Sequence, residues 1–265
     1  MANPTINALV DGAASPVKLR FEQVGLKASL GSRYLLKGIT FRLMAGDRLA
    51  IVGPSGAGKT SLLRLMNRLI DPHEGQIWYG DRPLSAYPVL KVRQSIPLVL
   101  QEPRLLGMTV AQTLTYPLQL RQIPADESRD RLHHWTERLH IPSDWLDRSE
   151  TQLSVGQRQL VSIARALMIH PQILLLDEPT AALDVGRRSH LVAVLRDYCQ
   201  QDGCTMVMVS HDLPTAQAFC SKLLYLVEGG IVQHTTHSEV DWSHLHEAIV
   251  QAEQQVTDWD DEDEA

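Results

Sequence analysis

Residues 49–60 read LAIVGPSGAGKT, and this stretch decides the fold of the chain. Its four apolar residues predict a buried strand, and the glycines after them allow a tight turn before the leucine-rich helix expected over Ser61 to Leu69. The segment from Gly53 to Thr60 meets the pattern G-x-x-x-x-G-K-[ST] at every position. The backbone N–H groups of this turn are therefore expected to face a polyphosphate at the start of a helix.

The side chains of this loop suggest how it binds a nucleotide. Lys59 is expected to reach the β- and γ-phosphates, and the Thr60 hydroxyl to ligate Mg²⁺. The remaining positions expected to contact the phosphates are Gly53, Pro54, Ser55, Gly56, Ala57, Gly58 and Ser61. A glycine-rich turn with an incidental lysine is the alternative, which the full match between a strand and a helix disfavours. The loop predicts nucleotide binding without saying which machine uses it.

A second strand ends in two acids. Residues 173–178 read ILLLDE, and a buried strand of an α/β sheet presents ligands at its C-terminal edge. Asp177 is expected to hold Mg²⁺, directly or through water. Because neighbouring residues on a strand point to opposite faces, Glu178 is free for another task, that of general base for the attacking water. Two solvated acids that cap a strand are the alternative, which the phosphate loop in the same chain disfavours.

Strand and helix patterns alternate along most of the chain. This favours an α/β core with a largely parallel sheet and a helical insertion in the middle. The expected strands are Leu19–Leu26, Gly38–Leu43, Arg48–Val52, Gln76–Tyr79, Ser95–Leu100, Ile173–Leu176, Thr205–Val209, Leu223–Val227 and Ile231–Gln233. The expected helices after the first are Thr109–Ile123, Asp126–His140, Gly156–Ile169, Gly186–Gln201 and Leu213–Ser221.

Composition limits the partners. The net charge of the 265 residues is −6, and the six acids between Thr257 and Ala265 account for all of it, because 25 acids then face 25 Lys and Arg. A neutral body gives no compositional support for nucleic-acid binding. The sequence shows no signal peptide and no apolar run of the roughly 18 residues that a spanning helix needs. We therefore expect a cytoplasmic protein, which meets a membrane only through another protein.

Two groups of metal-capable side chains favour ordinary explanations. The three cysteines, Cys199, Cys204 and Cys220, form an odd number at unremarkable spacing, which is typical of buried thiols in a reducing compartment. A late segment holds four histidines and two acids, and a solvated surface patch is favoured there over a zinc or nickel site. The side chains of that segment are His234, His237, Glu239, Asp241, His244 and His246.

Residues 153–166, LSVGQRQLVSIARA, carry the most specific pattern in the chain. Ser154 and Gln157 form an S-x-x-Q capping box before an apolar helix, which makes a second anion-binding helix N-terminus. With the two motifs above, this stretch resembles the signature of the ABC ATPase family, over roughly Lys18 to His234. In that family the signature closes on the ATP held by a partner's phosphate loop. Ser154, Val155, Gly156 and Gln157 are then the implied contacts to the partner's nucleotide.

The resemblance implies further site residues. Gln101, after an expected strand, resembles the glutamine that touches Mg²⁺ or the attacking water and links the core to the helical insertion. His211, in VSHD, resembles the switch histidine that contacts the γ-phosphate and orients the water. Residues 181–184, AALD, resemble the loop that crosses the dimer interface in that family, and Asp184 is the residue of this loop implied to contact the nucleotide site. The implied catalytic set is thus Glu178, His211, Gln101 and Lys59, and the implied metal set is Thr60, Gln101 and Asp177.

Two positions depart from the family pattern. Valine stands at position 155 where the family usually has glycine, so a Cβ restricts approach to the γ-phosphate while the backbone N–H donor remains. Leu30 stands where the family commonly has the aromatic ring that stacks on adenine, and Tyr34 is the nearby alternative. The sequence leaves the choice between Leu30 and Tyr34 open.

As a whole, the resemblance implies a P-loop NTPase core with a mostly parallel sheet, an antiparallel β N-terminal portion and an inserted helical subdomain. The expected parts are a leader over 1–16, an ATPase domain over 17–255 and a disordered acidic tail over 256–265. Within that domain the core covers 17–86 and 152–255, and the helical subdomain covers 87–151.

The implied function is ATP hydrolysis by a head-to-tail dimer around two Mg-ATP. The second ATPase subunit is an identical or related chain, and the dimer drives a separate transmembrane permease from the cytoplasmic face of the membrane. The alternative is a soluble ABC ATPase of an assembly system, such as iron–sulfur cluster assembly.

Overall fold

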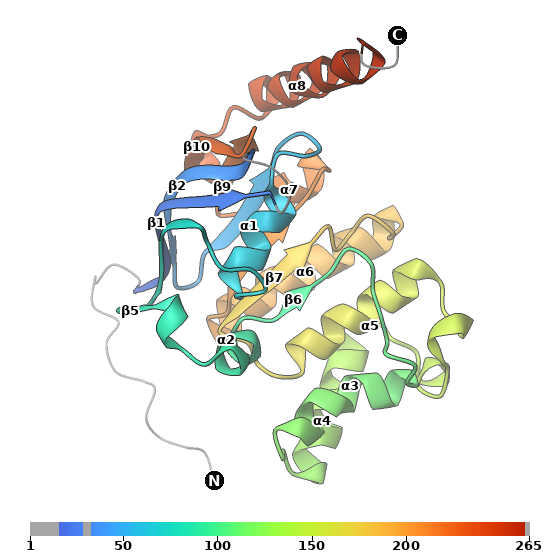
Figure 1. Ribbon diagram of the computed structural model, residues 1–265. Helices are drawn as coiled ribbons and strands as arrows, with labels where there is room; N and C mark the ends of the chain where they lie inside the picture. Colours follow the sequence, from blue (N-terminus) through green and yellow to red (C-terminus); the bar gives the residue numbers. More distant parts are fainter. Residues whose placement is uncertain (1–15, 29–32, 263–265) are drawn as a thin grey trace.

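The computed structural model describes residues 16–28 and 33–262, with side chains up to residue 254. The expected leader over 1–16 therefore lies, apart from Pro16, outside the described residues. Two sheets stand side by side, with helix α1 (Lys59–Met66) enclosed between them, while the long C-terminal helix α8 (Trp242–Glu262) projects at the top of the view (Figure 1).

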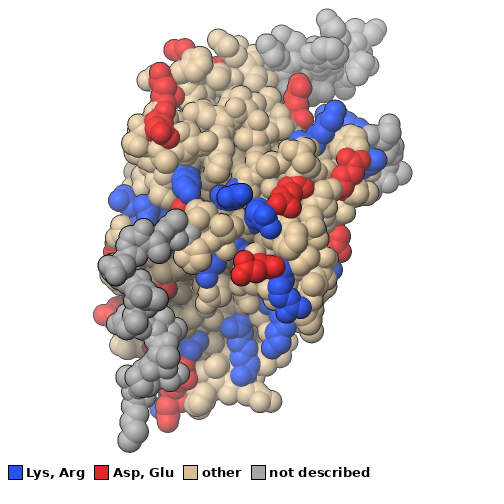
Figure 2. Space-filling model, turned by 90° about the vertical axis from the view of Figure 1, so that its left-hand side faces the viewer, with Lys and Arg blue, Asp and Glu red and all other residues tan. Residues whose placement is uncertain are grey.

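The small sheet is antiparallel. Its order is β2-β1-β4-β5, with β1 (Val17–Lys27), β2 (Tyr34–Met44), β4 (Glu74–Tyr79) and β5 (Arg82–Pro83). These strands confirm the antiparallel β portion near the N-terminus. On the face shown in Figure 2, Lys and Arg are interspersed with Asp and Glu. Within the small sheet, Arg20 pairs with Glu22, and Lys27 pairs with Glu74. That face therefore carries both signs of charge.

The large sheet is the mostly parallel core that the sequence predicts. Its order is β10-β9-β3-β8-β7-β6, and β10 alone runs antiparallel to its neighbour within the described residues. The strands are β3 (Arg48–Val52), β6 (Leu98–Val99), β7 (Ile173–Asp177), β8 (Thr205–Val209), β9 (Lys222–Val227) and β10 (Gly230–Thr236).

Both faces of this sheet are buried, as expected for a parallel sheet between helices. Along β7, Leu174 and Leu176 point into one apolar cluster while Ile173 and Leu175 point into the other. One cluster lies toward α1 and the small sheet. The other joins the sheet to α5 (Val155–Leu167), α6 (Val185–Asp202) and α7 (Leu213–Phe219). The three cysteines are free and buried, as the sequence predicts.

The helical insertion packs against one side of this core. Helices α3 (Val110–Leu120) and α4 (Ala125–Arg138) lie next to α5 (Figure 1) and share its apolar cluster. Trp135 of α4 packs edge-on against Tyr198 of α6 at 5.0 Å. Short 3₁₀ turns complete the chain, at η1 (Leu84–Ala86), η2 (Ser143–Trp145), η3 (Glu150–Gln152) and η4 (His237–Glu239). The exact limits of the helical subdomain, 87–151, stay a prediction.

The segment before β6 differs from the expected strand over Ser95–Leu100. Helix α2 (Val89–Ser95) ends at Ser95, and only Leu98 and Val99 pair with β7. Pro97 has no backbone N–H to donate to a neighbouring strand, so it limits the strand at this point. Val92 and Ile96 lie four residues apart, on one face of a helix, and both are buried in the cluster beside α1.

The acidic end also differs from expectation. Helix α8 (Trp242–Glu262) includes residues 256–262, where a disordered tail was expected, and residues 263–265 lie outside the described residues. The acidic stretch follows helical residues without any Gly or Pro that would end the helix. Leu245 is 3% exposed and anchors the start of α8 in the core.

Candidate functional site

The phosphate loop joins β3 to α1 in a conformation that requires glycine. Gly53 has φ 151°, and a Cβ there would lie 2.0 Å from the carbonyl oxygen of Leu226. Gly58 has φ 97°, and its Cβ would lie 2.7 Å from the carbonyl oxygen of Leu35. Both positions combine a left-handed φ with close backbone contact, so no other residue fits without moving the loop.

Lys59 is buried beneath this loop. Its Nζ donates to the carbonyl oxygens of Gly53 and Pro54, each at 2.7 Å, which holds the ammonium at the centre of the turn. Burial lowers the pKa of Lys59, while the carboxylates of Glu178, Glu253 and Asp177 act in the opposite direction. An ammonium that is short of hydration and whose hydrogen bonds, within the described residues, go to carbonyl oxygens can receive the negative oxygens of a polyphosphate.

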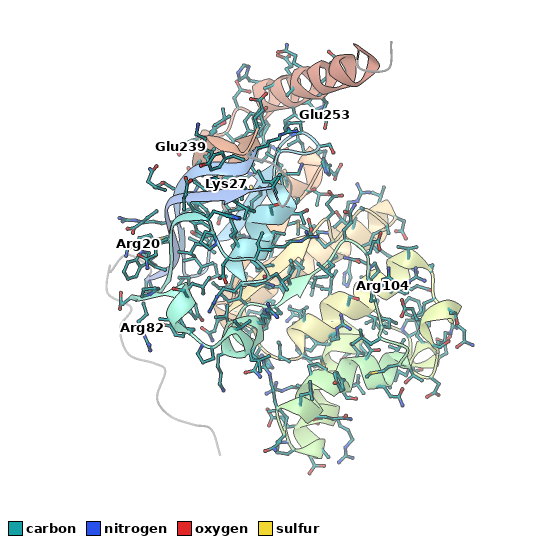
Figure 3. All side chains as sticks on the ribbon, viewed as in Figure 1. Arg20, Lys27, Arg82, Arg104, Glu239 and Glu253 are labelled. Atoms are coloured by element: carbon teal, nitrogen blue, oxygen red, sulfur yellow. The ribbon has the colours of Figure 1, made fainter. Side chains whose placement is uncertain are left out.

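Glu253 is a carboxylate that raises the pKa of Lys59 and that sequence reasoning missed. It lies on α8, and Figure 3 shows it on the side of that helix that faces the body of the protein. No motif marks it, because it lies almost 200 residues from Lys59 and only the fold brings α8 near the loop.

Thr60 and Asp177 meet at the C-terminal edge of the large sheet. The Thr60 hydroxyl donates to Asp177 Oδ1 at 3.2 Å, and Asp177 is 3% exposed. Burial raises the pKa of Asp177, although the hydrogen bond from Thr60 lowers it. A buried carboxylate and a hydroxyl side by side provide the oxygen ligands that Mg²⁺ prefers, and a divalent cation would relieve the cost of burying that charge.

Glu178 follows Asp177 and has two partners. Gln101 Nε2 donates to Glu178 Oε2 at 3.3 Å, and His211 Nε2 lies 2.8 Å from Glu178 Oε1. The backbone of Glu178 has φ 46°, a left-handed value that is strained for a residue with a Cβ. This turn directs Glu178 away from Asp177 and toward the ends of β6 and β8, where Gln101 and His211 lie.

These parts line one cavity of ≈ 460 Å³. Its wall contains Ser55, Gly56, Ala57, Gly58, Lys59, Thr60, Ser61, Gln101, Glu178 and His211, all of which the sequence analysis singled out, together with Leu35, which it did not. Leu35 reaches the loop from β2, where its carbonyl oxygen approaches Gly58. The fold thus gathers one side of the expected site, and the metal role of Gln101 stays a prediction because its amide lies on Glu178.

Tyr34 lies beside a neighbouring cavity of ≈ 280 Å³. That cavity shares Leu35 and Gly56 with the first one, and its other lining residues are Arg33, Glu228 and Gly229. The Tyr34 hydroxyl donates to the Glu74 carboxylate, and Lys27 Nζ lies 5.0 Å from the ring centroid. Leu30, the other candidate for the adenine contact, lies outside the described residues. The contact of Tyr34 with adenine stays a prediction.

The signature residues form the start of α5, outside the cavity. The capping box is present, because Ser154 accepts from the N–H of Gln157 while Gln157 accepts from the N–H of Ser154. Val155 is 50% exposed. Gly156 packs so tightly that a Cβ there would lie 2.4 Å from the carbonyl oxygen of Ala182. Asp184 caps α6 by accepting from the N–H of Arg187 at 2.9 Å.

The late histidine segment is structured by other contacts. The ring of His234 packs edge-on against Phe41 at 5.8 Å, and burial lowers its pKa. Glu239 accepts hydrogen bonds from Thr235 and Thr236 instead of facing a histidine. Within the described residues, no three His, Cys, Asp or Glu side chains are grouped closely enough to hold a metal ion.

The sequence of the chain is similar to a known protein family and to known proteins. A family model described as ABC transporter matches residues 36–181. Phosphate import ATP-binding protein PstB of Aeropyrum pernix is 31% identical over 234 residues, which cover 84% of this chain and 92% of PstB.

Two longer relatives match as well. Carnitine transport ATP-binding protein OpuCA of Listeria monocytogenes is 31% identical over 84% of this chain, and methionine import ATP-binding protein MetN of Thermobifida fusca is 35% identical over 75%. The matches span 56% of OpuCA and 63% of MetN, so the chain covers less than two thirds of these relatives.

Solved structures resemble the fold over most of its length. The cbiO1 protein of Clostridium perfringens, described as part of the transporter complex cbiONQ, superposes with a TM-score of 0.76 at 29% identity, over 85% of this chain and 90% of cbiO1. The dimeric ATP-binding cassette MJ0796, bound to ADP and Pi, gives a TM-score of 0.77 at 28% identity, over 83% of this chain and 98% of MJ0796.

Proposed function

The chain belongs to the ABC transporter family of ATP-binding proteins, and on this basis we propose that it hydrolyses ATP to drive a separate transmembrane permease. One observation carries the hydrolytic part of the proposal. Glu178 contacts Gln101 and His211, and the three line one cavity together with the phosphate loop. Phosphoryl transfer requires a held polyphosphate, neutralised charge and an oriented water, and these residues match those needs.

Each residue has a distinct task in this proposal. Backbone N–H groups of the loop and the Lys59 ammonium bind the β- and γ-phosphates. Glu178 takes a proton from the attacking water, while Gln101 and His211 hold that water in line by exchanging their bonds to Glu178 for bonds to it. Thr60 and Asp177 would hold Mg²⁺, which neutralises charge on the phosphates when bound.

We further propose that two such chains complete each site head to tail. Ser154, Val155, Gly156, Gln157 and Asp184 lie outside the cavity of their own subunit, so their contact with nucleotide needs a second copy or a related chain. Half-exposed Val155 stands at the N-terminus of α5, where the helix dipole favours an anion. The description of MJ0796 as a dimer with ADP and Pi supports this arrangement.

Docking of a permease is supported by exposed apolar side chains near the helical insertion. Leu100, Leu106, Tyr116 and Leu120, in the segment after β6 and on α3, are 37–66% exposed. Exposed apolar side chains mark a partner site where they gather into a contiguous patch. PstB, OpuCA and MetN are named as transport or import proteins, which favours transport over the soluble assembly alternative. We place the chain at the cytoplasmic face of the membrane, through the permease alone.

Substitution Glu178→Gln tests this function. The variant keeps the phosphate loop, Thr60 and Asp177, so its affinity for ATP should stay within about twofold of wild type. Loss of the proton acceptor should lower kcat by on the order of 100-fold or more, and ATP should then trap a dimer. Turnover is measured as phosphate release, ATP affinity by equilibrium binding, and the dimer by size-exclusion chromatography with ATP.

Glu137→Gln is the matched control. Glu137 lies on α4 with an exposed side chain, so the same chemical change there should leave turnover and assembly unchanged. Near-normal turnover in Glu178→Gln would remove Glu178 from its role. A wild-type chain that neither binds ATP nor releases phosphate would contradict the function as a whole.

A further inference from the structure

The segment that carries Gln101 is held at both ends by side chains. It leaves β6 at Leu100, runs along α5 and enters α3 after Leu105 (Figure 1). At its far end, Glu150 accepts from the N–H of Leu105 at 3.0 Å, and Thr113 donates to the carbonyl oxygen of Leu105 at 3.2 Å. Leu105 itself is fully buried. This end of the segment is therefore fixed to the helical insertion.

Helix α5 contributes two more bonds to the same segment. Gln159 Nε2 donates to the carbonyl oxygen of Leu100 at 3.4 Å, just before Gln101. Arg165 Nη1 donates to the carbonyl oxygen of Arg104 at 3.0 Å, three residues after Gln101. Figure 3 labels Arg104 beside α5. The two donors bracket Gln101, so its backbone cannot shift far unless α5 shifts with it.

Gln159 is an unusual residue for a helix core. It is 2% exposed, and within the described residues its Oε1 has no hydrogen-bond partner. It shares the buried side of α5 with Leu160 and Ile163, at a position where a leucine would pack without leaving a polar atom unpaired. An unpaired buried oxygen is destabilising. The hydrogen bond from Gln159 Nε2 to the Leu100 carbonyl oxygen is the interaction that offsets this cost.

We propose that Gln159 and Arg165 are positioning residues, which fix the segment around Gln101 so that the position of α5 determines whether Gln101 engages Glu178. This proposal rests on the proposed hydrolysis at Glu178. The observed bond from Gln101 Nε2 to Glu178 Oε2, at 3.3 Å, is the contact that the two residues hold in place.

The consequence concerns the link between the two nucleotides of a dimer. The N-terminus of α5 carries Ser154 and Val155, which face the partner's nucleotide in the proposed dimer. The same helix, one and three turns later, fixes the position of Gln101 in its own subunit through Gln159 and Arg165. A nucleotide bound on one side of the subunit thus moves the water-orienting residue on the other side through a single rigid helix.

The test uses Gln159→Met in the full chain. Methionine keeps the volume and removes both polar atoms, so the thermal midpoint should not fall. Loss of the bond to Leu100 should lower kcat by about tenfold with KM for ATP changed less than twofold, because a small misplacement near the reacting atoms is costly while the phosphate loop is intact. In a Gln101→Ala background the same substitution should have no further effect, since both act through one contact.

Ser162→Ala is the matched control, because Ser162 is a buried α5 residue whose Oγ has no partner in the described structure. Arg165→Met, which removes the other anchor, should reproduce the loss of kcat, and Arg165→Lys should restore part of it. Equal losses of kcat from Gln159→Met in the wild-type and Gln101→Ala backgrounds would overturn the positioning role, as would an unchanged kcat.

Amide hydrogen exchange tests the positioning role of Gln159 independently of the proposed ATP hydrolysis. Exchange in the peptide over residues 98–105 should rise in Gln159→Met and not in Ser162→Ala, whether or not the chain hydrolyses ATP. Unchanged exchange in that peptide overturns the proposal even if the wild type is an active ATPase. A wild type without turnover would instead contradict the proposed function.

Discussion

Two adjacent carboxylates have different environments. Asp177 ends β7 with a hydrogen bond from Thr60 and almost no exposure, whereas Glu178 turns away with a left-handed backbone and meets Gln101 and His211. The sequence predicts their separation from the alternation of side chains along a strand, but β7 ends at Asp177 and it is the left-handed turn at Glu178 that separates them. The strain at Glu178 and its two partners belong to the tertiary structure.

The buried charge of Asp177 leads to a prediction about pH. Its folded pKa is raised by burial, so the folded state binds a proton more readily than the unfolded state, and this group lowers stability as pH rises from 3.8 through the folded pKa. Asp177→Asn removes that loss. Without Mg²⁺ at pH 7, the variant should gain about 1 kcal/mol in the free energy of unfolding.

Denaturant unfolding at pH 7 and at pH 3 measures this gain, which should disappear at the lower pH because the wild-type carboxyl is then protonated in both states. Turnover with Mg²⁺ should fall by roughly 100-fold. A variant that is less stable than wild type at pH 7 would show that the carboxylate is stabilised by its surroundings instead.

The motifs predict which of these residues lie together, while their roles stay predictions. Gly53 to Ser61, Gln101, Glu178 and His211 were named from sequence, and the fold brings members of all four segments to one cavity. Leu35 and Glu253 were not named, because one contributes a backbone carbonyl and the other a charge from the far end of the chain. Spacing along a sequence carries no information about either.

Among the helices, α5 and α6 begin in the same way. Ser154-Val155-Gly156 and Asp184-Val185-Gly186 each place a capping side chain before valine and glycine. Their surroundings differ, because the first glycine packs on the backbone that precedes the second helix. A Cβ at Gly156 would lie 2.4 Å from the carbonyl oxygen of Ala182, whereas at Gly186 the nearest atom is Asp184 Oδ1 at 3.5 Å.

Alanine substitutions at the two glycines should therefore have opposite effects. Gly156→Ala should lower the free energy of unfolding by about 1–3 kcal/mol, since the carbonyl of Ala182 must move. Gly186→Ala should raise it by up to about 1 kcal/mol, because alanine is the better helix former and meets only an ordinary contact. Denaturant midpoints of the two variants provide the comparison, and equal shifts in one direction would show that the packing at Ala182 has no energetic role.

Element boundaries were predicted unevenly for physical reasons. The buried strands β3, β7 and β8 have continuous apolar runs and were found within a residue. Helix α2 is not among the expected elements, and the strand expected over Ser95–Leu100 is reduced to β6, because the short apolar run around Pro97 has no clear period. Helix α8 was missed because histidines and acids hide the apolar positions, of which Leu245 and Ile249 pack on the core.

As a whole, the molecule has its polar and apolar functional surfaces in different places. The cavity lies at the edge of the large sheet, while the exposed apolar side chains of the segment after β6 and of α3 lie on the helical insertion. Within the described residues, no helix is both long and apolar enough to cross a bilayer. The permease proposed above would meet the chain at these exposed side chains of the helical insertion.

Affinity purification from detergent-solubilised membranes checks this, and it should recover a polytopic membrane protein. Leu106→Asn should weaken that recovery, because Leu106 is 64% exposed and its φ of 61° suits asparagine, so the fold is not disturbed. Leu90→Asn, at an exposed leucine of α2, is the control and should leave recovery unchanged. Recovery of soluble scaffold proteins instead would favour an assembly system.

The left-handed backbone at Glu178 has a consequence for how this protein evolves under heat. Glycine or asparagine adopts that conformation with less cost, so replacing the glutamate should make the fold more resistant to unfolding. In a random library screened only for folded protein at high temperature, inactive variants with glycine or asparagine at position 178 would accumulate. Under the general-base role proposed above, glutamate at this position serves turnover at the expense of backbone stability.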